Sequence, residues 1–210
     1  MSEIVSYELI DHVGVITVNN PPVNALSHAL RQGLQEAVTA AQSDSSKALL
    51  LICAGRTFIA GADITEFGKP PQAPSLPEVL VTLENSAKPI IAAIHGTALG
   101  GGFETALACH YRCALPSAKV GLPEVKLGLL PGAGGTQRVP RLAGVEAALA
   151  LMSTGNPVAA EDAASMHLID RVLQGEDLKT AALAYAQELV AQGASPKRVR
   201  DLQIDRKSVV

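Results

Sequence analysis

Hydrophobic residues fall into short apolar runs along the chain, separated by polar and turn-forming residues. Residues 4–10 and 13–18 are rich in β-branched and aliphatic side chains and flank Asp11 and His12, which predicts two strands joined by a tight hairpin. Continuous or nearly continuous apolar runs of this length are typical of buried strands. Four more such strands are predicted, at residues 48–53, 90–94, 111–114 and 168–172.

Between these strands the apolar residues recur at helical spacing. Ser27 precedes one such stretch and is a favoured N-cap residue, so a helix is predicted at residues 28–42. Further helices are predicted at residues 76–87, 103–109, 145–154 and 178–192, with another beginning at Gly134 or Gly135. In contrast, residues 120–124 contain glycine and proline and are expected to be turned rather than regular. The order strand, strand, helix, strand, then loop and helix indicates an α/β fold built from repeating ββα units.

The point where this pattern of strands and helices ends suggests a domain boundary. Residues 1–192 are predicted to form one core, and residues 193–210 a polar tail or the start of a linker to a further region. The tail contains a basic run at residues 197–200, which is expected to be a solvated face rather than a binding patch.

Composition and charge limit the classes of function that the chain can have. The chain has 210 residues, of which 48% are hydrophobic and 18% charged, as expected for a globular domain. A net charge of −3 and an aromatic content of 3% disfavour nucleic-acid binding. The N-terminus lacks a signal-peptide pattern and no apolar run reaches the length of a membrane span, so we expect no membrane association and a cytoplasmic location.

Metal and thiol chemistry are not expected. Cys53, Cys109 and Cys113 lie in largely apolar surroundings and fit reduced structural thiols. No histidine stands at metal-ligand spacing, and His95, at the end of a strand, is interpreted as a structural residue. The sequence therefore predicts no metal site.

The candidate chemistry centres on two glutamates. Gly100, Gly101 and Gly102 precede the short helix at residues 103–109, so unpaired N–H groups at its start could bind an anion. Glu104 is the one ionisable side chain of residues 103–108, and Glu124 follows Pro123 in another largely apolar run. Carboxylates in apolar settings beside N–H donors suggest general acid/base catalysis next to an oxyanion hole.

Simpler interpretations stay open at this point. Either glutamate, taken alone, could be a solvated surface carboxylate. Gly61 could be a turn residue and Asp63 a helix cap. A phosphate-binding loop at the glycines of residues 128–135 is excluded because the required lysine is missing. A serine hydrolase is disfavoured because no Gly-x-Ser-x-Gly motif occurs.

Three blocks of sequence resemble the crotonase superfamily, specifically its enoyl-CoA hydratases and isomerases. These are Ala60-Gly61-Ala62-Asp63-Ile64, Gly100 to Glu104, and Pro123-Glu124 followed by residues 130–138. The resemblance implies a right-handed spiral of ββα units with surrounding helices. Residues 106–112 look most like the N-terminal hydratase part of bifunctional enzymes that also carry a 3-hydroxyacyl-CoA dehydrogenase. Because single-function members usually continue further, the resemblance also implies a truncated chain.

The resemblance assigns roles to residues of this chain. The N–H groups of Ala62 and Gly101 would hold the thioester oxygen of a 2-enoyl-CoA, and Glu104 and Glu124 would add water across its double bond. Other residues would contact the substrate or its CoA part, namely Ala60, Gly61, Asp63, Ile64, Gly100, Pro123 and Gly132. CoA is thus part of the substrate, and no separate cofactor is expected.

The expected function is hydration of 2-enoyl-CoA thioesters in fatty-acid β-oxidation, with possible isomerisation of 3-enoyl-CoA. The alternatives are an isomerase alone, an acyl-CoA hydrolase, an inactive hydratase domain of a bifunctional enzyme, or a non-catalytic scaffold or RNA-binding relative. The two glutamates and the acidic balance disfavour the last of these. The chain would be a homotrimer or hexamer as a stand-alone enzyme, and could be a monomer as a fragment.

Overall fold

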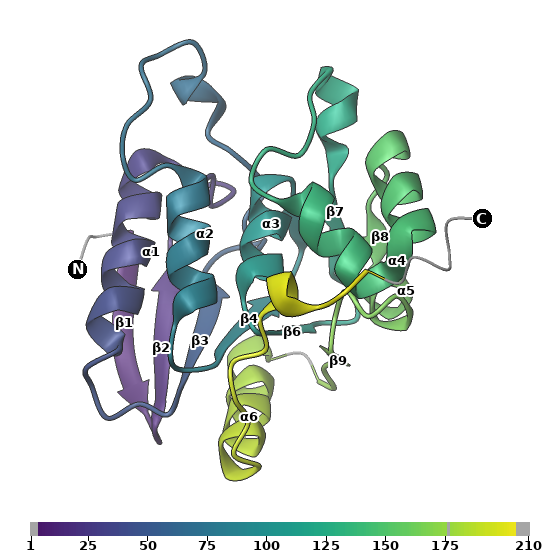
Figure 1. Ribbon diagram of the computed structural model, residues 1–210. Helices are drawn as coiled ribbons and strands as arrows, with labels where there is room; N and C mark the ends of the chain where they lie inside the picture. Colours follow the sequence, from purple (N-terminus) through teal and green to yellow (C-terminus); the bar gives the residue numbers. More distant parts are fainter. Residues whose placement is uncertain (1–3, 176, 205–210) are drawn as a thin grey trace.

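The computed structural model describes residues 4–175 and 177–204 and contains a six-stranded sheet in the order β1-β2-β3-β4-β6-β9 (Figure 1). β1 (Val5–Ile10) and β2 (Val13–Val18) are antiparallel. Asp11 and His12 join them with φ of 44° and 68°, the positive values that a tight two-residue hairpin requires. The other strands follow in parallel: β3 (Ala48–Cys53), β4 (Ile90–Ile94), β6 (Tyr111–Ala114) and β9 (Arg171–Val172).

A second sheet has the order β5-β7-β8, with strands β5 (Thr97–Leu99), β7 (Lys119–Gly121) and β8 (Val158–Ala159). β5 directly follows β4, and β7 follows β6, so successive passes of the chain place one strand in each sheet. This repeat is the spiral of ββα units that the sequence predicted. The expectation of a turned backbone at residues 120–124 was wrong at Val120 and Gly121, which pair with β5, and right from Pro123 on.

Helices bury both faces of the large sheet. α1 (His28–Ala41), α2 (Leu76–Asn85) and α3 (Gly101–Ala108) lie side by side over one face, and α6 (Leu178–Ala191) covers the other (Figure 1). The alternation within β3 follows from this arrangement. Leu49 and Leu51 belong to the core under α1 to α3, whereas Leu50 belongs to the core under α6.

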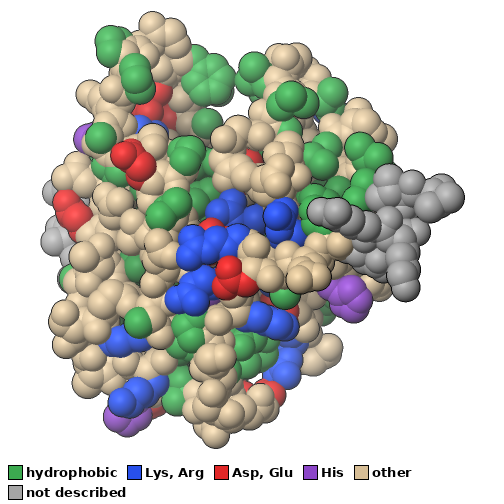
Figure 2. Space-filling view, viewed as in Figure 1, with side chains coloured by type: hydrophobic (Ala, Val, Ile, Leu, Met, Phe, Trp, Pro, Cys, Tyr) green, Lys and Arg blue, Asp and Glu red, His purple; other side chains and the backbone are tan. Residues whose placement is uncertain are grey.

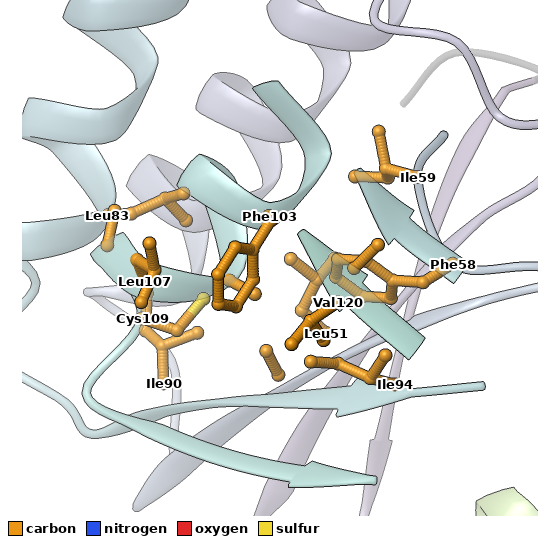
Figure 3. Packing of buried hydrophobic residues seen from close by; sticks show 14 of the residues in the cluster. Leu51, Phe58, Ile59, Leu83, Ile90, Ile94, Phe103, Leu107, Cys109 and Val120 are labelled. Atoms are coloured by element: carbon orange, nitrogen blue, oxygen red, sulfur yellow. The ribbon is translucent and has the colours of Figure 1, made fainter. Parts of the chain in front are cut away.

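Phe103 of α3 lies at the centre of the larger core. Figure 3 shows its ring between Leu107 and Cys109 on one side and Val120 and Leu51 on the other. All five side chains are fully buried. α3 is therefore fixed by packing on nearly every side, which fixes the direction of any functional group that it carries.

α4 (Gly135–Thr154) combines two helices that the sequence predicted separately. Gly144 interrupts it with a non-helical φ of 82° and ψ of 167°, so the second half begins at Val145 as expected. After α5 (Ala160–Ser165), the strand predicted from residue 168 begins only at Arg171. The reason is that the N–H groups of Leu168 and Ile169 bond to the carbonyl of Ala163, which continues the end of α5.

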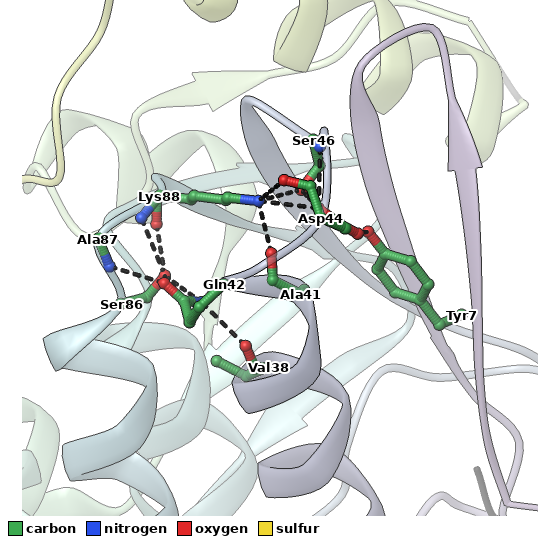
Figure 4. A network of polar contacts seen from close by, with 9 residues as sticks. All are labelled: Tyr7, Val38, Ala41, Gln42, Asp44, Ser46, Ser86, Ala87 and Lys88. Atoms are coloured by element: carbon green, nitrogen blue, oxygen red, sulfur yellow. Dashed lines mark hydrogen bonds and ion pairs between the residues drawn. The ribbon is translucent and has the colours of Figure 1, made fainter.

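A polar network joins the end of α1 to the approach to β4 (Figure 4). Lys88 Nζ lies 2.8 Å from Asp44 Oδ1 and also donates to the carbonyl of Ala41 in the last turn of α1. Tyr7 and Ser46 donate to the same carboxylate. Although burial opposes ionisation of Asp44, the hydrogen bonds from Lys88, Ser46 and Tyr7 outweigh it and hold the Asp44 pKa below its usual value.

Part of the polar tail expected at residues 193–210 packs against the core, at residues 198–201. A 3₁₀ turn, η3 (Val199–Asp201), buries Val199 to 2% exposure, and Arg198 Nε donates to the carbonyl of Glu84 at 2.9 Å. The expectation of a solvated face was thus wrong for Val199 and Arg198. The apolar residue within the basic run was the available signal, because its burial brings the flanking arginines onto α2.

Candidate active site

Glu104 lies in the first turn of α3 and is only 2% exposed. Its Oε1 accepts hydrogen bonds from the N–H groups of Ala133, at 2.8 Å, and Gly135, at 2.7 Å. A Cβ at Gly135 would lie 3.1 Å from that oxygen, closer than most Cβ contacts, so a side chain here would make the carboxyl shift by a few tenths of an ångström. The interpretation of Glu104 as a solvated surface carboxylate is therefore wrong.

The protonation of Glu104 reflects two opposing effects. Burial raises the pKa of its carboxyl, while the Gly135 and Ala133 amides and the positive charge of Arg138 lower it. Burial has the larger effect, so the pKa of Glu104 lies above its usual value. A carboxyl with these surroundings is held in one orientation and can exchange a proton at higher pH than a surface glutamate.

Glu124 is the second residue of η2 (Pro123–Leu127) and is half-buried. Its Oε2 is buried and makes no hydrogen bond within residues 4–175 and 177–204, while its Oε1 lies 3.2 Å from the position a Cβ at Gly100 would take. Burial raises the Glu124 pKa, and the charge of Glu104 raises it further. The two carboxyls therefore lie within electrostatic reach of one another.

Two main-chain amides lie beside this pair. Gly100 has φ of 52° and donates its own N–H to Gly121, so the chain turns sharply and α3 begins at Gly101. The N–H groups of Gly101 and Ala62 make no hydrogen bond with any part of the chain that the structure describes. A Cβ at Gly101 would lie 4.0 Å from Ala62 N, which places the two amides next to each other.

The loop that carries Ala62 is fixed by backbone pairing. The Leu26 N–H donates to the Gly61 carbonyl at 2.9 Å, and Leu26 and Ala62 form a parallel bridge. Gly61 has φ of 130°, a value that side chains rarely allow. The structure thus brings Ala62, the α3 residues Gly101 and Glu104, and Glu124 together from three separate segments of the sequence.

The other expected contact residues are arranged around this centre. Asp63 caps η1 (Ile64–Glu66) through Thr65 N–H at 2.9 Å, which agrees with the simpler interpretation of this aspartate. Ile64 is 74% exposed, and Gly132 is exposed on the loop that precedes α4. Ala60 donates its N–H to Val23, so this amide is already used within the fold. The substrate contacts expected of Ala60, Asp63, Ile64 and Gly132 stay predictions.

The cavity next to these amides has a volume of about 660 Å³ and is lined by Leu26, Ala62, Phe67 and Leu76 among others. Arg31 holds its outer wall, because Nη1 pairs with Glu66 at 2.8 Å and Nε donates to the Pro74 carbonyl at 2.9 Å. An arginine on the apolar face of the predicted helix 28–42 was the signal that could have indicated this role.

A buried ion pair behind Glu104 was also missed. Arg138 makes a two-pronged contact with Glu84 at 3.1 and 3.0 Å, and its Nη1 donates to the Ala133 carbonyl at 2.9 Å. The N–H of Ala133 binds Glu104. Glu84 therefore connects to Glu104 through two residues in direct contact. Glu84 follows Leu83 and stands four residues after Leu80, on the apolar face of the helix predicted at residues 76–87, which was the sequence signal.

The described residues contain neither a cluster suited to a metal ion nor a helix suited to crossing a membrane. Across residues 4–175 and 177–204, no three histidine, cysteine, aspartate or glutamate side chains are grouped so as to hold a metal ion. None of the helices in the same residues is long and apolar enough to span a membrane.

Known proteins resemble this chain in fold and in sequence. The spiral is that of the crotonase fold, shared with an enoyl-CoA hydratase from Bacillus anthracis at a TM-score of 0.84 and 35% identity, over 90% of this chain and 77% of that one. Residues 8–205 match the enoyl-CoA hydratase/isomerase family, and the chain belongs to that family. The structure of Pseudomonas aeruginosa DspI is similar too, at a TM-score of 0.84 and 34% identity over 93% of this chain and 77% of that one.

Longer proteins resemble the chain as well. A peroxisomal bifunctional enzyme of Danio rerio is 47% identical over 196 residues, 92% of this chain and 27% of that protein. The peroxisomal fatty acid β-oxidation multifunctional protein MFP2 of Arabidopsis thaliana is 43% identical over 195 residues, 87% of this chain and 26% of that protein. The chain thus spans about a quarter of the length of these curated relatives.

Proposed function

We propose that the chain hydrates 2-enoyl-CoA thioesters. The observation that carries this proposal is the meeting of two carboxyls with raised pKa values, Glu104 and Glu124, beside the unpaired amides of Ala62 and Gly101. Membership of the enoyl-CoA hydratase/isomerase family supports it. The name of the Arabidopsis thaliana relative, a fatty acid β-oxidation multifunctional protein, supports a role in that pathway.

In this mechanism the thioester oxygen accepts hydrogen bonds from Ala62 and Gly101. These donors stabilise the negative charge that develops on that oxygen, and each contributes about 2.7 to 4 kcal/mol in related oxyanion holes. Glu104 takes a proton from a water molecule as its oxygen bonds to C3. Protonated Glu124 gives its proton to C2, so one water is added in total.

Isomerisation of 3-enoyl-CoA to 2-enoyl-CoA is the second candidate. It requires one carboxyl to remove a proton at one carbon and return it at another. Glu124 is suited to this because its Oε2 has no competing hydrogen bond among the described residues. Glu104 is engaged by two amides and is not needed for this step. The family name covers both reactions.

The expected substrate, cofactor, assembly and location are part of the same proposal. The substrate is an acyl-CoA thioester, no cofactor beyond its CoA part is required, and the assembly is a trimer or hexamer, or a monomer if the chain acts as part of a longer protein. A cytoplasmic location stays a prediction, and the names of the relatives place them in peroxisomes and glyoxysomes. An acyl-CoA hydrolase and an inactive hydratase domain are the alternative outcomes.

The test is the loss of enoyl absorbance when crotonyl-CoA is mixed with the purified chain. The account predicts catalysed loss that disappears in the double variant Glu104→Gln/Glu124→Gln, with circular dichroism checking that both proteins are folded. A folded wild-type chain that leaves crotonyl-CoA unchanged would contradict the proposal. Release of free CoA instead would identify a hydrolase.

A further inference from the structure

The loop before α4 holds Glu104 through main-chain amides of two separate peptide groups. The Ala133 N–H belongs to the peptide group of residues 132 and 133, and the Gly135 N–H to that of residues 134 and 135. Both bond to Glu104 Oε1, at 2.8 and 2.7 Å, and Oε2 makes no hydrogen bond within the described residues. The planar peptide group of residues 133 and 134 lies between these donors, so its orientation decides whether both amides meet on one oxygen.

Arg138 fixes that central peptide group. Its Nη1 donates to the Ala133 carbonyl at 2.9 Å, and its main-chain N–H donates to the Gly134 carbonyl at 2.9 Å. A Cβ at Gly134 would overlap with the same Nη1, so the loop closes directly on the guanidinium group. One residue therefore holds two consecutive carbonyls of the loop that orients Glu104.

The guanidinium group is itself held by Glu84 of α2. Nε and Nη2 of Arg138 contact the two oxygens of this carboxylate at 3.1 and 3.0 Å, a planar two-pronged geometry that lysine cannot form. The Glu84 and Arg138 side chains are 3% and 10% exposed, so water and salt screen the pair little. The guanidinium group is thus fixed between α2 and the loop before α4.

The turn η3 strengthens the end of α2 that carries Glu84. Arg198 Nε donates to the Glu84 carbonyl at 2.9 Å, and Arg200 Nη1 lies 3.8 Å from Glu84 Oε2. Figure 2 shows Lys and Arg side chains gathered at the centre of this face of the molecule, over α4 and η3. The contact of Arg200 is long and its side chain is exposed, so Arg138 is the main partner of the carboxylate.

We propose that Arg138, held by Glu84, is a positioning residue for hydration. By fixing the peptide group of residues 133 and 134, it keeps both amides on Glu104 Oε1 and leaves Oε2 free to take the proton of the attacking water. Isomerisation uses Glu124, and neither Arg138 nor Glu84 makes a hydrogen bond or ion pair with Glu124. The inference rests on the proposed hydratase function and adds to it a residue that favours hydration over isomerisation. A pair that only stabilised the fold would leave the ratio of the two reactions unchanged.

The test measures kcat and KM for hydration of crotonyl-CoA and for isomerisation of a 3-enoyl-CoA. Arg138→Lys keeps the positive charge but loses the planar fork that joins Glu84 to the Ala133 carbonyl. The double variant Glu84→Leu/Arg138→Met removes both charges together, and apolar replacement of a buried ion pair is often neutral for stability. The double variant therefore keeps the inference testable if the lysine variant does not fold, with circular dichroism and urea unfolding checking each protein.

Arg112→Lys is the matched control. Arg112 is also a buried arginine with a carboxylate partner, Asp170, at 3.0 Å, and its Nη1 donates to the Cys109 carbonyl at 2.9 Å. Cys109 directly follows α3, whereas Glu104 is in the first turn of that helix. The control thus disturbs a buried pair at the opposite end of α3 and leaves the loop before α4 untouched.

The expected result is a hydration kcat about tenfold lower in both Arg138 variants, because a loop shift of less than about 1 Å displaces Glu104. The KM values and the isomerisation kcat should stay within about twofold, and the control should leave the ratio of the two reactions unchanged. Equal loss of both reactions, or an unchanged hydration rate in a folded variant, would overturn the inference and leave the hydratase proposal intact. A wild-type chain without turnover would contradict the hydratase proposal, and this inference with it.

Discussion

Glu104 and Glu124 lie within electrostatic reach of one another but differ in how the fold holds them. Glu104 is on a helix buried on nearly every side, and two amides of the loop before α4 fix its Oε1. Glu124 is on a 3₁₀ turn, and its Oε2 has no partner within the described chain. The first environment favours holding a water molecule in one position, and the second favours moving a proton between carbons.

The strongest test of this difference removes the free carboxyl. Glu124→Gln should reduce both hydration and isomerisation by roughly 10² to 10⁴, because each reaction needs the proton that Glu124 carries. Initial rates with crotonyl-CoA and with a 3-enoyl-CoA measure the two effects. Isomerisation at the wild-type rate would show that another group moves the proton.

The support behind Glu104 can be removed without touching a reacting residue. Glu84→Gln takes the charge from a carboxylate that is 3% exposed and leaves Arg138 buried beside the loop of Ala133. Breaking such a pair typically costs about 3 to 5 kcal/mol of unfolding free energy. Urea unfolding measures the cost, with Glu188→Gln, which breaks the exposed pair with Arg171, as a control expected to lose less than about 1 kcal/mol. Similar losses in both variants would show that the buried pair has no special role.

A smaller change crowds Glu104. In Gly135→Ala the new Cβ would lie 3.1 Å from Glu104 Oε1 and 3.0 Å from Leu122 Cδ1, so these side chains must give by a few tenths of an ångström. Because a misplacement of about 1 Å can cost about 10²-fold, this smaller shift should lower hydration by roughly tenfold. Isomerisation, which depends on Glu124, should fall much less. Equal loss of both rates would place the disturbance at Glu124 as well.

The smallest expected effect concerns stability and pH. Burial raises the pKa of both glutamates in the folded chain, so they favour folding at low pH, and this contribution is lost as the pH rises through the folded-state pKa values. Glu124→Gln should therefore unfold at higher urea than the wild type at pH 7, and the difference should shrink toward pH 4.

Asp44 behaves oppositely, since its lowered pKa stabilises the fold above the usual pKa and the gain is lost on acidification. Asp44→Asn should therefore be less stable than the wild type at pH 7, and this deficit should shrink as the pH falls below the usual aspartate pKa. A deficit in urea unfolding that grows on acidification would contradict this sign for Asp44.

Sequence patterns predicted the parts of the molecule that rest on local chemistry. The run of residues 48–53, the hairpin at Asp11 and His12, and the helix after Ser27 all formed where expected, because each depends on neighbouring residues. β5 was missed because three residues between glycines carry too little pattern, and its pairing with β7 is a long-range contact.

The candidate site likewise combines features that the local sequence indicated with contacts that depend on distant parts of the chain. The apolar setting of Glu104 indicated burial, but its partners, Ala133 and Gly135, are about 30 positions away along the chain and offer only backbone amides. Backbone donors carry little residue-type signal, and only the helix start predicted at Gly134 or Gly135 indicated where they lie. The roles of Arg138 and Arg200 likewise depend on the packing of α4 and η3 against α2.

The most direct test of the account measures hydration and isomerisation side by side in Glu104→Gln. The account predicts that hydration is abolished, because the amide-held carboxylate activates the water. It also predicts that part of the isomerisation survives, because Glu124 alone moves that proton. Loss of the two activities by the same factor would contradict the division of roles between the two carboxyls.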